Sequence, residues 1–178
     1  MTERLLRSLQ PFLDTPFIRR VRRNHGLEHA TIHLLSQRIP HLRLAGRSDA
    51  GGFWLLGNVP TEEVRQAVAQ ALVRLRRGEH QLALHPTCGT NFVTVALIGT
   101  AAVLLALIGS ERERFGKLQR IPLIAVGLLF AAMLGQPLGM RLQQYVTTLG
   151  DPGDLEITAV RQIAGSGLSV HRVETRSS

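Results

Sequence analysis

Two uncharged stretches decide the fold of this chain: FVTVALIGTAAVLLALIG at 92–109 and IPLIAVGLLFAAMLGQPLGM at 121–140. Each approaches the roughly 20 apolar residues that an α-helix needs to cross the hydrocarbon core of a bilayer. A soluble fold of 178 residues has little core with which to cover two such runs. The sequence therefore predicts membrane helices over 92–110 and 121–140, joined by the charged loop 111–120 into an antiparallel hairpin. The alternative is a pair of buried helices in a soluble protein.

The segments on both sides of the hairpin are predicted to form one α+β domain. Before the hairpin we expect a helix through 26–37, strands at 42–46 and 53–56, and an amphipathic helix that begins near Thr61 and ends at Gly78. After it, strands are predicted at 155–163 and 168–174, around a turn at 164–167. These late strands are too short to fold alone, so we expect them to join the earlier pair in a small mixed sheet. The predicted domains are 25–91, the transmembrane hairpin 92–141, and the completing strands 142–178.

Charge points to an anionic partner. The chain has 21 Lys and Arg against 13 Asp and Glu, a formal net charge of +8, and residues 1–24 form a basic amphipathic segment. We expect this segment to lie on the lipid bilayer, with a solvated arm or a cap on the domain as alternatives. Aromatic residues make up 4%, which supplies few stacking platforms for nucleic acid. A membrane-tethered nucleic-acid binder, favoured by charge alone, is our third hypothesis.

The chemistry-bearing stretch is His25-Gly26-Leu27-Glu28-His29, an H-x-x-E-H pattern. On a helix the two histidines are four residues apart and project from one face, so they can share a metal ion. Glu28 is close enough to act as general base on a water that the ion activates. The simpler interpretation is a pair of ordinary polar side chains on a helix surface.

Further donors, His85 and Cys88, precede the first apolar run. If one of them binds the ion, a coordination position stays open for water; if both bind, the site is closed and structural. Cys88 can also be an ordinary small buried side chain, and as the single cysteine it excludes an intramolecular disulfide. This fits a reducing compartment, so we expect the domain on the cytoplasmic side. His33 is a surface or outer-shell candidate, Glu79 and Asp49 are reserve ligands, and no partner is predicted for His41, His80 and His171.

Small residues recur at every fourth position of the second apolar run: Gly127, Ala131, Gly135 and Gly139. This spacing lets helix backbones approach closely in lipid. We expect it to support helix packing, with a homo-oligomer through this face as one outcome.

The segments HGLEHATI at 25–32 and HPTCGTNFV at 85–93 resemble those of uncharacterised bacterial membrane proteins, among them the YqhQ-like family, which is suspected of being metal-dependent. The chain as a whole is similar to a related domain-of-unknown-function family with a similar membrane hairpin. The resemblance covers about 20 residues and departs in chain length and in the intervening hairpin. It implies a multi-pass protein of the bacterial cytoplasmic membrane with site residues His25, Glu28, His29, His85, Cys88 and Asn91. The H-x-x-E-H order is also that of inverzincin peptidases, but no equivalent of their distant third-ligand glutamate is evident.

Two hypotheses lead. The first is an integral membrane metalloprotein, a hydrolase of peptidase-like mechanism that uses Zn²⁺ or another divalent transition metal. A site at the membrane surface would suit a membrane-associated peptide or a lipid-linked substrate. The second is non-catalytic: a structural metal clip ties the helix at 25–37 to the hairpin, and the basic domain serves as an assembly or interaction module.

Overall fold

The computed structural model describes residues 2–108, 116–163 and 169–178, which form two compact units. The first unit comprises Met1–His85 and Gln144–Ser178, and the second comprises Pro86–Gln143. Part of the charged loop predicted at 111–120, and the whole turn predicted at 164–167, lie outside the described residues.

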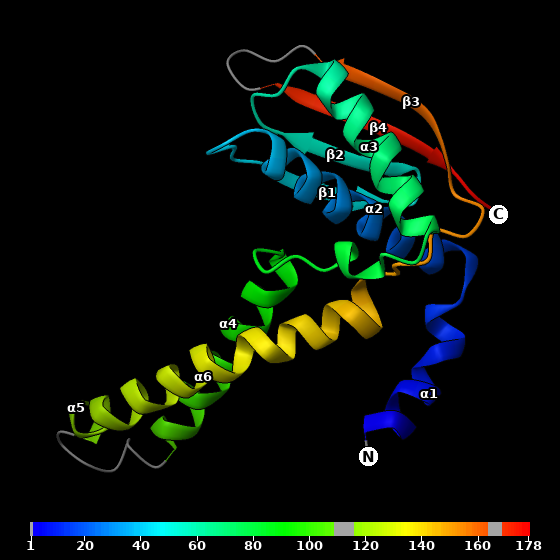
Figure 1. Ribbon diagram of the computed structural model, residues 1–178. Coiled ribbons are helices and arrows are strands. Elements are labelled where there is room, and N and C mark those ends of the chain that lie inside the picture. Colours follow the sequence, from blue (N-terminus) through cyan, green and yellow to red (C-terminus); the bar gives the residue numbers. More distant parts are fainter. Residues whose placement is uncertain (1, 109–115, 164–168) are drawn as a thin grey trace. The chain divides into compact units, whose positions relative to one another are not determined.

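The first unit is an α+β domain, as predicted (Figure 1). A four-stranded sheet in the order β1-β2-β4-β3 is built from two hairpins that lie far apart in the sequence. Strand β2 pairs with β4, so the late strands do complete the early pair. All three pairings are antiparallel, so the described sheet is antiparallel rather than mixed. The strands are β1 (Ala45–Asp49), β2 (Gly52–Leu56), β3 (Glu156–Ile163) and β4 (Val170–Arg176).

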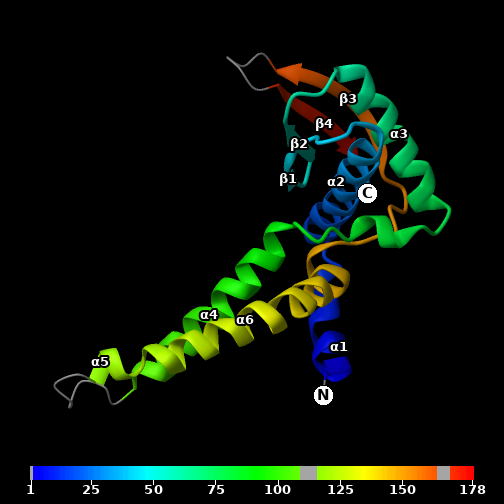
Figure 2. The same cartoon turned by 60° about the vertical axis from the view of Figure 1, so that its left-hand side comes forward.

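Helices α2 (Pro16–Arg38) and α3 (Thr61–Arg76) cover one face of this sheet, as both views show (Figure 2). Alternate residues of the central strands point toward them, because side chains of a strand alternate between faces. Phe53 of β2 lies opposite Val173 of β4, and both are fully buried. Burying an aliphatic or aromatic side chain of this size contributes about 1.5–3 kcal/mol, so this layer is the main source of stability. Its other fully or nearly fully buried members include Leu27, Leu35, Leu55, Val64, Val68 and Leu75.

Helix α2 is longer than the sequence predicted. It begins at Pro16 rather than near Gly26, while its end at Arg38 agrees with the stop expected before Pro40. Proline at the first helical position is favourable, because its missing N–H would have no partner there. Thr15, before the helix, donates its hydroxyl to the Phe12 carbonyl at the end of α1 (Thr2–Leu13). The arginine cluster at 19–23 is therefore part of the same helix as the histidines.

The second unit is an antiparallel helical hairpin of α4 (Gly89–Leu107) and α6 (Ile121–Leu142), with the short α5 (Gly116–Gln119) before α6. The last helix continues as a π-helix, η3 (Gln143–Thr147). Near one end, Gln143 Nε2 donates to Asn91 Oδ1 (2.8 Å), and Asn91 Nδ2 donates to the Pro86 carbonyl (2.7 Å). Asn91, a site residue by resemblance, therefore joins the two helices.

The small-residue stripe of α6 packs within the chain. A Cβ placed on Gly127, Gly135 or Gly139 would run into Ala102, Val95 or Asn91 of α4, and Ala131 is buried at the same contact. Close backbone approach is what this spacing permits. A homo-oligomer through this stripe would have to displace α4.

Two helices among the described residues are long and apolar enough to cross a membrane: Gly89–Leu107 and Ile121–Thr147. Most of their large apolar side chains are exposed, among them Leu105, Leu129 and Met133. Such length and composition also occur in core helices of soluble proteins, but those helices are mostly buried.

Candidate metal centre

The H-x-x-E-H motif lies on α2, and its two histidines meet as predicted. One helical turn separates His25 from His29, and their rings approach edge to face with centroids 4.3 Å apart. Between them, Gly26 lets the helix pass close to the segment after η3. A Cβ at position 26 would lie 2.5 Å from the Leu149 carbonyl oxygen. The absence of a side chain here brings the 147–149 main chain within reach of His25.

Main-chain carbonyls fix both imidazoles. His25 Nδ1 lies 2.9 Å from the Thr147 carbonyl oxygen, and His29 Nδ1 lies 2.7 Å from that of Ala83. A carbonyl oxygen only accepts hydrogen bonds, so Nδ1–H donates in both rings and the lone pair of each neutral ring is on Nε2. Carbonyl partners on the second nitrogen are the usual means of orienting metal-binding histidines. The donor chemistry of this pair therefore fits a metal ion.

His85 and His33 extend this group within the same unit. His85 follows the 3₁₀-helix η1 (His80–Ala83), and its ring centroid lies 5.9 Å from that of His29 and 6.2 Å from that of His33. Burial lowers the pKa of His85, and the charges of His29 and His33 lower it further. This favours the neutral ring, which is the form that binds metals. His33, expected at the surface or in an outer shell, thus belongs to the histidine cluster.

Glu28 is held by strand β1. Glu28 is 4% exposed, its carboxylate accepts a hydrogen bond from the Ser48 hydroxyl, and a Cβ on Gly46 would collide with the carboxylate. Burial raises the pKa of Glu28, while the Ser48 hydrogen bond and the charge of His25 oppose the rise. Glu28 is therefore a buried carboxyl group on which the charge of His25 acts.

Sequence reasoning missed Gly46 and Ser48. It placed the strand at 42–46, whereas β1 spans Ala45–Asp49. With the observed bounds, positions 46 and 48 are two apart on a strand and face the same side, which is the signal that would have found them. The carbonyls of Ala83 and Thr147 carry no such signal, because any residue type has a carbonyl.

Cys88 belongs to the second unit, where it is the residue that precedes α4. It follows His85 by three residues. Even a fully extended chain spans at most about 3.6 Å per residue, so the Cα atoms of His85 and Cys88 are no more than about 11 Å apart. The covalent chain therefore limits how far Cys88 can lie from His85.

The reserve ligands Glu79 and Asp49 are engaged elsewhere. Glu79 accepts hydrogen bonds from the Arg74 guanidinium, and Asp49 pairs with Arg172 at 2.7 and 2.9 Å. These hydrogen bonds from arginine are the main reason that the pKa of each carboxyl group lies below its usual value. A carboxylate that is already paired with arginine is a poor candidate for a metal.

Among the histidines for which no partner was predicted, His171 has one. It is buried on β4, and its Nε2 lies 3.2 Å from the Thr61 hydroxyl. Burial lowers the pKa of His171. This histidine therefore belongs to the core of the domain rather than to the cluster.

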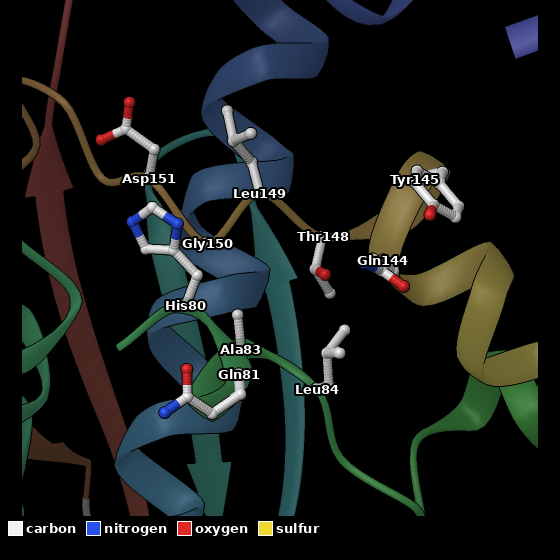
Figure 3. Close-up of a pocket in the computed structure, with 10 residues that line it drawn as sticks. All are labelled: His80, Gln81, Ala83, Leu84, Gln144, Tyr145, Thr148, Leu149, Gly150 and Asp151. Atoms are coloured by element: carbon white, nitrogen blue, oxygen red, sulfur yellow. The ribbon is translucent and has the colours of Figure 1, made fainter. Parts of the chain in front are cut away.

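A pocket of about 380 Å³ opens in the first unit between η1 and the segment 144–151 (Figure 3). Its wall includes Ala83, whose carbonyl holds His29, and Thr148, which follows the carbonyl that holds His25. Figure 3 shows Tyr145 on the π-helix side and His80 near Asp151 on the other side. None of the lining residues that the structure describes is Lys or Arg, the side chains that most often bind phosphate.

Comparison with known proteins gives a relative and a family model. An uncharacterized protein of Picosynechococcus sp. (strain ATCC 27264 / PCC 7002 / PR-6) is 35% identical over 139 residues, which cover 72% of this chain and 65% of that protein. The matched region thus spans somewhat less than two thirds of the relative. No solved structure matches the chain. The resemblance to the YqhQ-like family stays a prediction. A family model described as Domain of unknown function (DUF6391) matches residues 20–160, more than half of the chain, and the chain therefore belongs to this family.

Proposed function

We propose that the protein is an integral membrane metalloprotein whose His25 and His29 bind a divalent transition-metal ion of the zinc class. The observation that carries this proposal is the pair of Nδ1 hydrogen bonds to main-chain carbonyls, at 2.9 and 2.7 Å. They set the tautomer of both rings, whose centroids are 4.3 Å apart, and leave Nε2 of each ring as the atom that can bind a metal.

Cys88 is the third ligand in this proposal. His25, His29 and Cys88 together offer two imidazole nitrogens and one sulfur, a donor set that zinc and cobalt accept in proteins. The short chain between His85 and Cys88 supports this assignment. Three protein ligands leave one position of a tetrahedral site open, which is the arrangement of catalytic zinc.

The reaction we propose is hydrolysis. An ion bound at this site would supply Lewis acidity toward a water molecule. Glu28 would accept a proton from that water, the remaining hydroxide would add to the substrate carbonyl carbon, and Glu28 would return the proton to the amine that leaves as the C–N bond breaks. Burial raises the pKa of Glu28 toward neutral pH, which suits a group that must both accept and donate a proton.

The bilayer is the proposed surroundings of α4 and α6. Their exposed apolar side chains support insertion as a two-helix hairpin. The α+β domain is proposed on the cytoplasmic side because the single cysteine of the chain fits a reducing compartment. The pocket beside the histidine-holding segments is the proposed substrate site. Its described lining offers amide, hydroxyl, carboxyl and imidazole groups beside apolar side chains and no Lys or Arg, so it suits a membrane-associated peptide better than a phosphate-bearing lipid-linked substrate.

A structural metal clip is the second candidate. The Ser48 hydrogen bond favours it, because it gives the Glu28 carboxylate a role in joining α2 to β1 that requires no catalysis. In this alternative both His85 and Cys88 bind the ion, and the closed site ties the histidine helix to the hairpin.

Elemental analysis of the detergent-purified full chain tests metal binding. We expect about one zinc-class ion or more per wild-type chain, and loss of most of it in His25→Ala, His29→Ala and Cys88→Ser. The matched control is His41→Asn, which removes an exposed histidine at φ 59° and keeps a residue type that tolerates this conformation. Wild-type protein that contains no metal, when purified without chelator, would refute both candidate functions.

Cobalt substitution separates the two candidates without a known substrate. In Co²⁺-loaded wild-type protein, azide should bind the open position and shift the visible ligand-field bands. Glu28→Gln should retain the ion and the azide response, because Glu28 is not a ligand. Bands that azide leaves unchanged would indicate a closed site and favour the structural clip.

A further inference from the structure

His33 is the histidine of α2 that the proposed centre does not use. It lies one helical turn beyond His29, and its ring meets the ring of His85 edge to face, with centroids 6.2 Å apart. His85 in turn faces His29 at 5.9 Å, and His29 faces His25 at 4.3 Å. The four rings therefore form one continuous row within the first unit. His29 is 3% exposed, whereas His33 and His85 are only partly buried.

One ion cannot serve both ends of this row. Eight residues separate position 25 from position 33, and an α-helix rises about 12 Å over that distance. Metal–nitrogen bonds are only about 2.1 Å long, so an ion bound by His25 and His29 lies beyond the reach of His33.

The His33–His85 end has the chemistry of a site of its own. In a tetrahedral site, two imidazoles on one ion have ring centroids about 5 Å apart. The observed distance between the ring centroids of His33 and His85, 6.2 Å, shortens to this value when side-chain rotation moves the rings together by roughly 1 Å. Imidazole binds Zn²⁺, Ni²⁺, Cu²⁺ and Co²⁺, and water can complete the coordination at two partly exposed rings.

We infer that His33 and His85 bind a second divalent transition-metal ion, beside the ion that we propose at His25 and His29. This inference rests on the proposed function, because the two sites share one row of imidazoles. It also leaves the first ion with Cys88, rather than His85, as its third ligand. The second site contains no sulfur ligand, so its ion is distinguishable by spectroscopy.

Titration of the metal-free, detergent-purified full chain with Co²⁺ tests the inference. Two Co²⁺ ions should bind per wild-type chain. One of them should develop a thiolate-to-cobalt charge-transfer band from Cys88, while the other should add only ligand-field bands. We expect the second ion to bind at least tenfold more weakly, since two protein ligands hold it rather than three.

His33→Gln should lose one ion and keep the charge-transfer band, because glutamine has similar bulk and is a poor ligand for these metals. His85→Gln is a second variant on the other element and should lose the same ion, so either variant can decide if the other misfolds. The control His41→Asn should bind both ions.

A wild-type chain that binds one ion, or a folded His33→Gln chain that still binds two, would overturn the second site and leave the proposed function standing. A wild-type chain that binds none would refute the proposed function itself. Circular dichroism and gel filtration establish that each variant compared is folded.

Discussion

Hydrogen bonds fix all three polar side chains of the H-x-x-E-H motif. The Thr147 and Ala83 carbonyls accept from His25 and His29. The Ser48 hydroxyl donates to the carboxylate of Glu28, which lies between the two histidines in the sequence. The motif therefore divides into two roles at the residue scale. The two histidines are oriented so that the lone pair on Nε2 is available to a metal ion, and the glutamate is hydrogen-bonded to the sheet.

The close contact between Gly46 and the Glu28 carboxylate predicts that a side chain at position 46 lowers stability. Gly46→Ala adds a Cβ against the Glu28 carboxylate, so we expect a loss of about 1–3 kcal/mol in the free energy of unfolding. Thermal unfolding in detergent measures this loss. The control is Gly89→Ala, where nothing lies within 4 Å of the added Cβ. Equal stability of the two variants would mean that β1 does not confine the carboxylate.

The buried His171 predicts a pH dependence of stability. Its pKa in the folded protein lies below the ordinary value of about 6.5, so between these values the unfolded chain binds more protons than the folded one. The free energy of unfolding must then fall as the pH drops through about 6.5. The unfolding temperature of wild type should decrease more from pH 7.5 to 5.5 than that of His171→Gln. Parallel decreases would show that His171 does not contribute.

At the scale of elements, α2 is the part on which the first unit is assembled. Asn24, fully buried, donates from Nδ2 to the Asp49 carbonyl of β1 (2.8 Å) and accepts from the Thr175 hydroxyl of β4 (2.6 Å). On another face, Arg22 donates to the carbonyls of Tyr145 and Thr148. The helix thus joins the sheet to the segment that returns from α6.

Asn24→Ala should weaken the contact of α2 with the sheet. It leaves the Asp49 carbonyl and the Thr175 hydroxyl without their partner, at a cost of about 1–3 kcal/mol. Chemical denaturation measures the change. Arg65→Ala, which breaks an exposed pair with Glu62, is the comparison and should cost less than about 0.5 kcal/mol. If the two changes are equal, Asn24 does not tie the elements together.

The helical hairpin depends on close approach at its small residues. Gly135→Val places a branched side chain against Val95, so α4 and α6 must separate and the hairpin should lose stability. Ala132→Val, on an exposed position of α6, should be nearly neutral. Thermal aggregation in detergent compares them. A neutral Gly135→Val would indicate that the two helices do not pack through this stripe.

The elements that the sequence predicted best are those with a strong period. The apolar spacing of Val64, Val68 and Leu75 placed α3, and the uncharged runs placed α4 and α6. The start of α2 was missed because Arg19–Arg23 obscures the apolar period, although Pro16 marks it. The fixing of His25 and His29 was not predictable, since it depends on main-chain carbonyls brought close by tertiary packing. His33 was placed too far from the cluster because helix spacing alone ignores the segment at His85.

At the scale of the whole molecule, the hairpin is inserted in sequence between two parts of the chain that fold into one domain. Strand β2 precedes the hairpin and β4 follows it, yet they pair in register. Both ends of the hairpin therefore return to the same domain. A protein built this way must keep its domain on one side of the bilayer if the hairpin crosses it twice.

Membrane extraction tests that arrangement. After expression, the full chain should stay in the membrane pellet through an alkaline carbonate wash and enter solution only with detergent. The physical reason is the exposed apolar side chains of α4 and α6, because insertion removes this large apolar surface from water and places it in lipid. Release by carbonate alone would contradict insertion.

The central claim is that His25, His29 and Cys88 hold a metal ion, and X-ray absorption at the zinc edge tests it most directly. Protein loaded with one zinc equivalent should show imidazole scattering and one sulfur neighbour at about 2.3 Å. Cys88→Ser should lose the sulfur, and His41→Asn should retain the wild-type spectrum. A spectrum with only oxygen neighbours, or one that Cys88→Ser and His29→Ala leave unchanged, would contradict the claim.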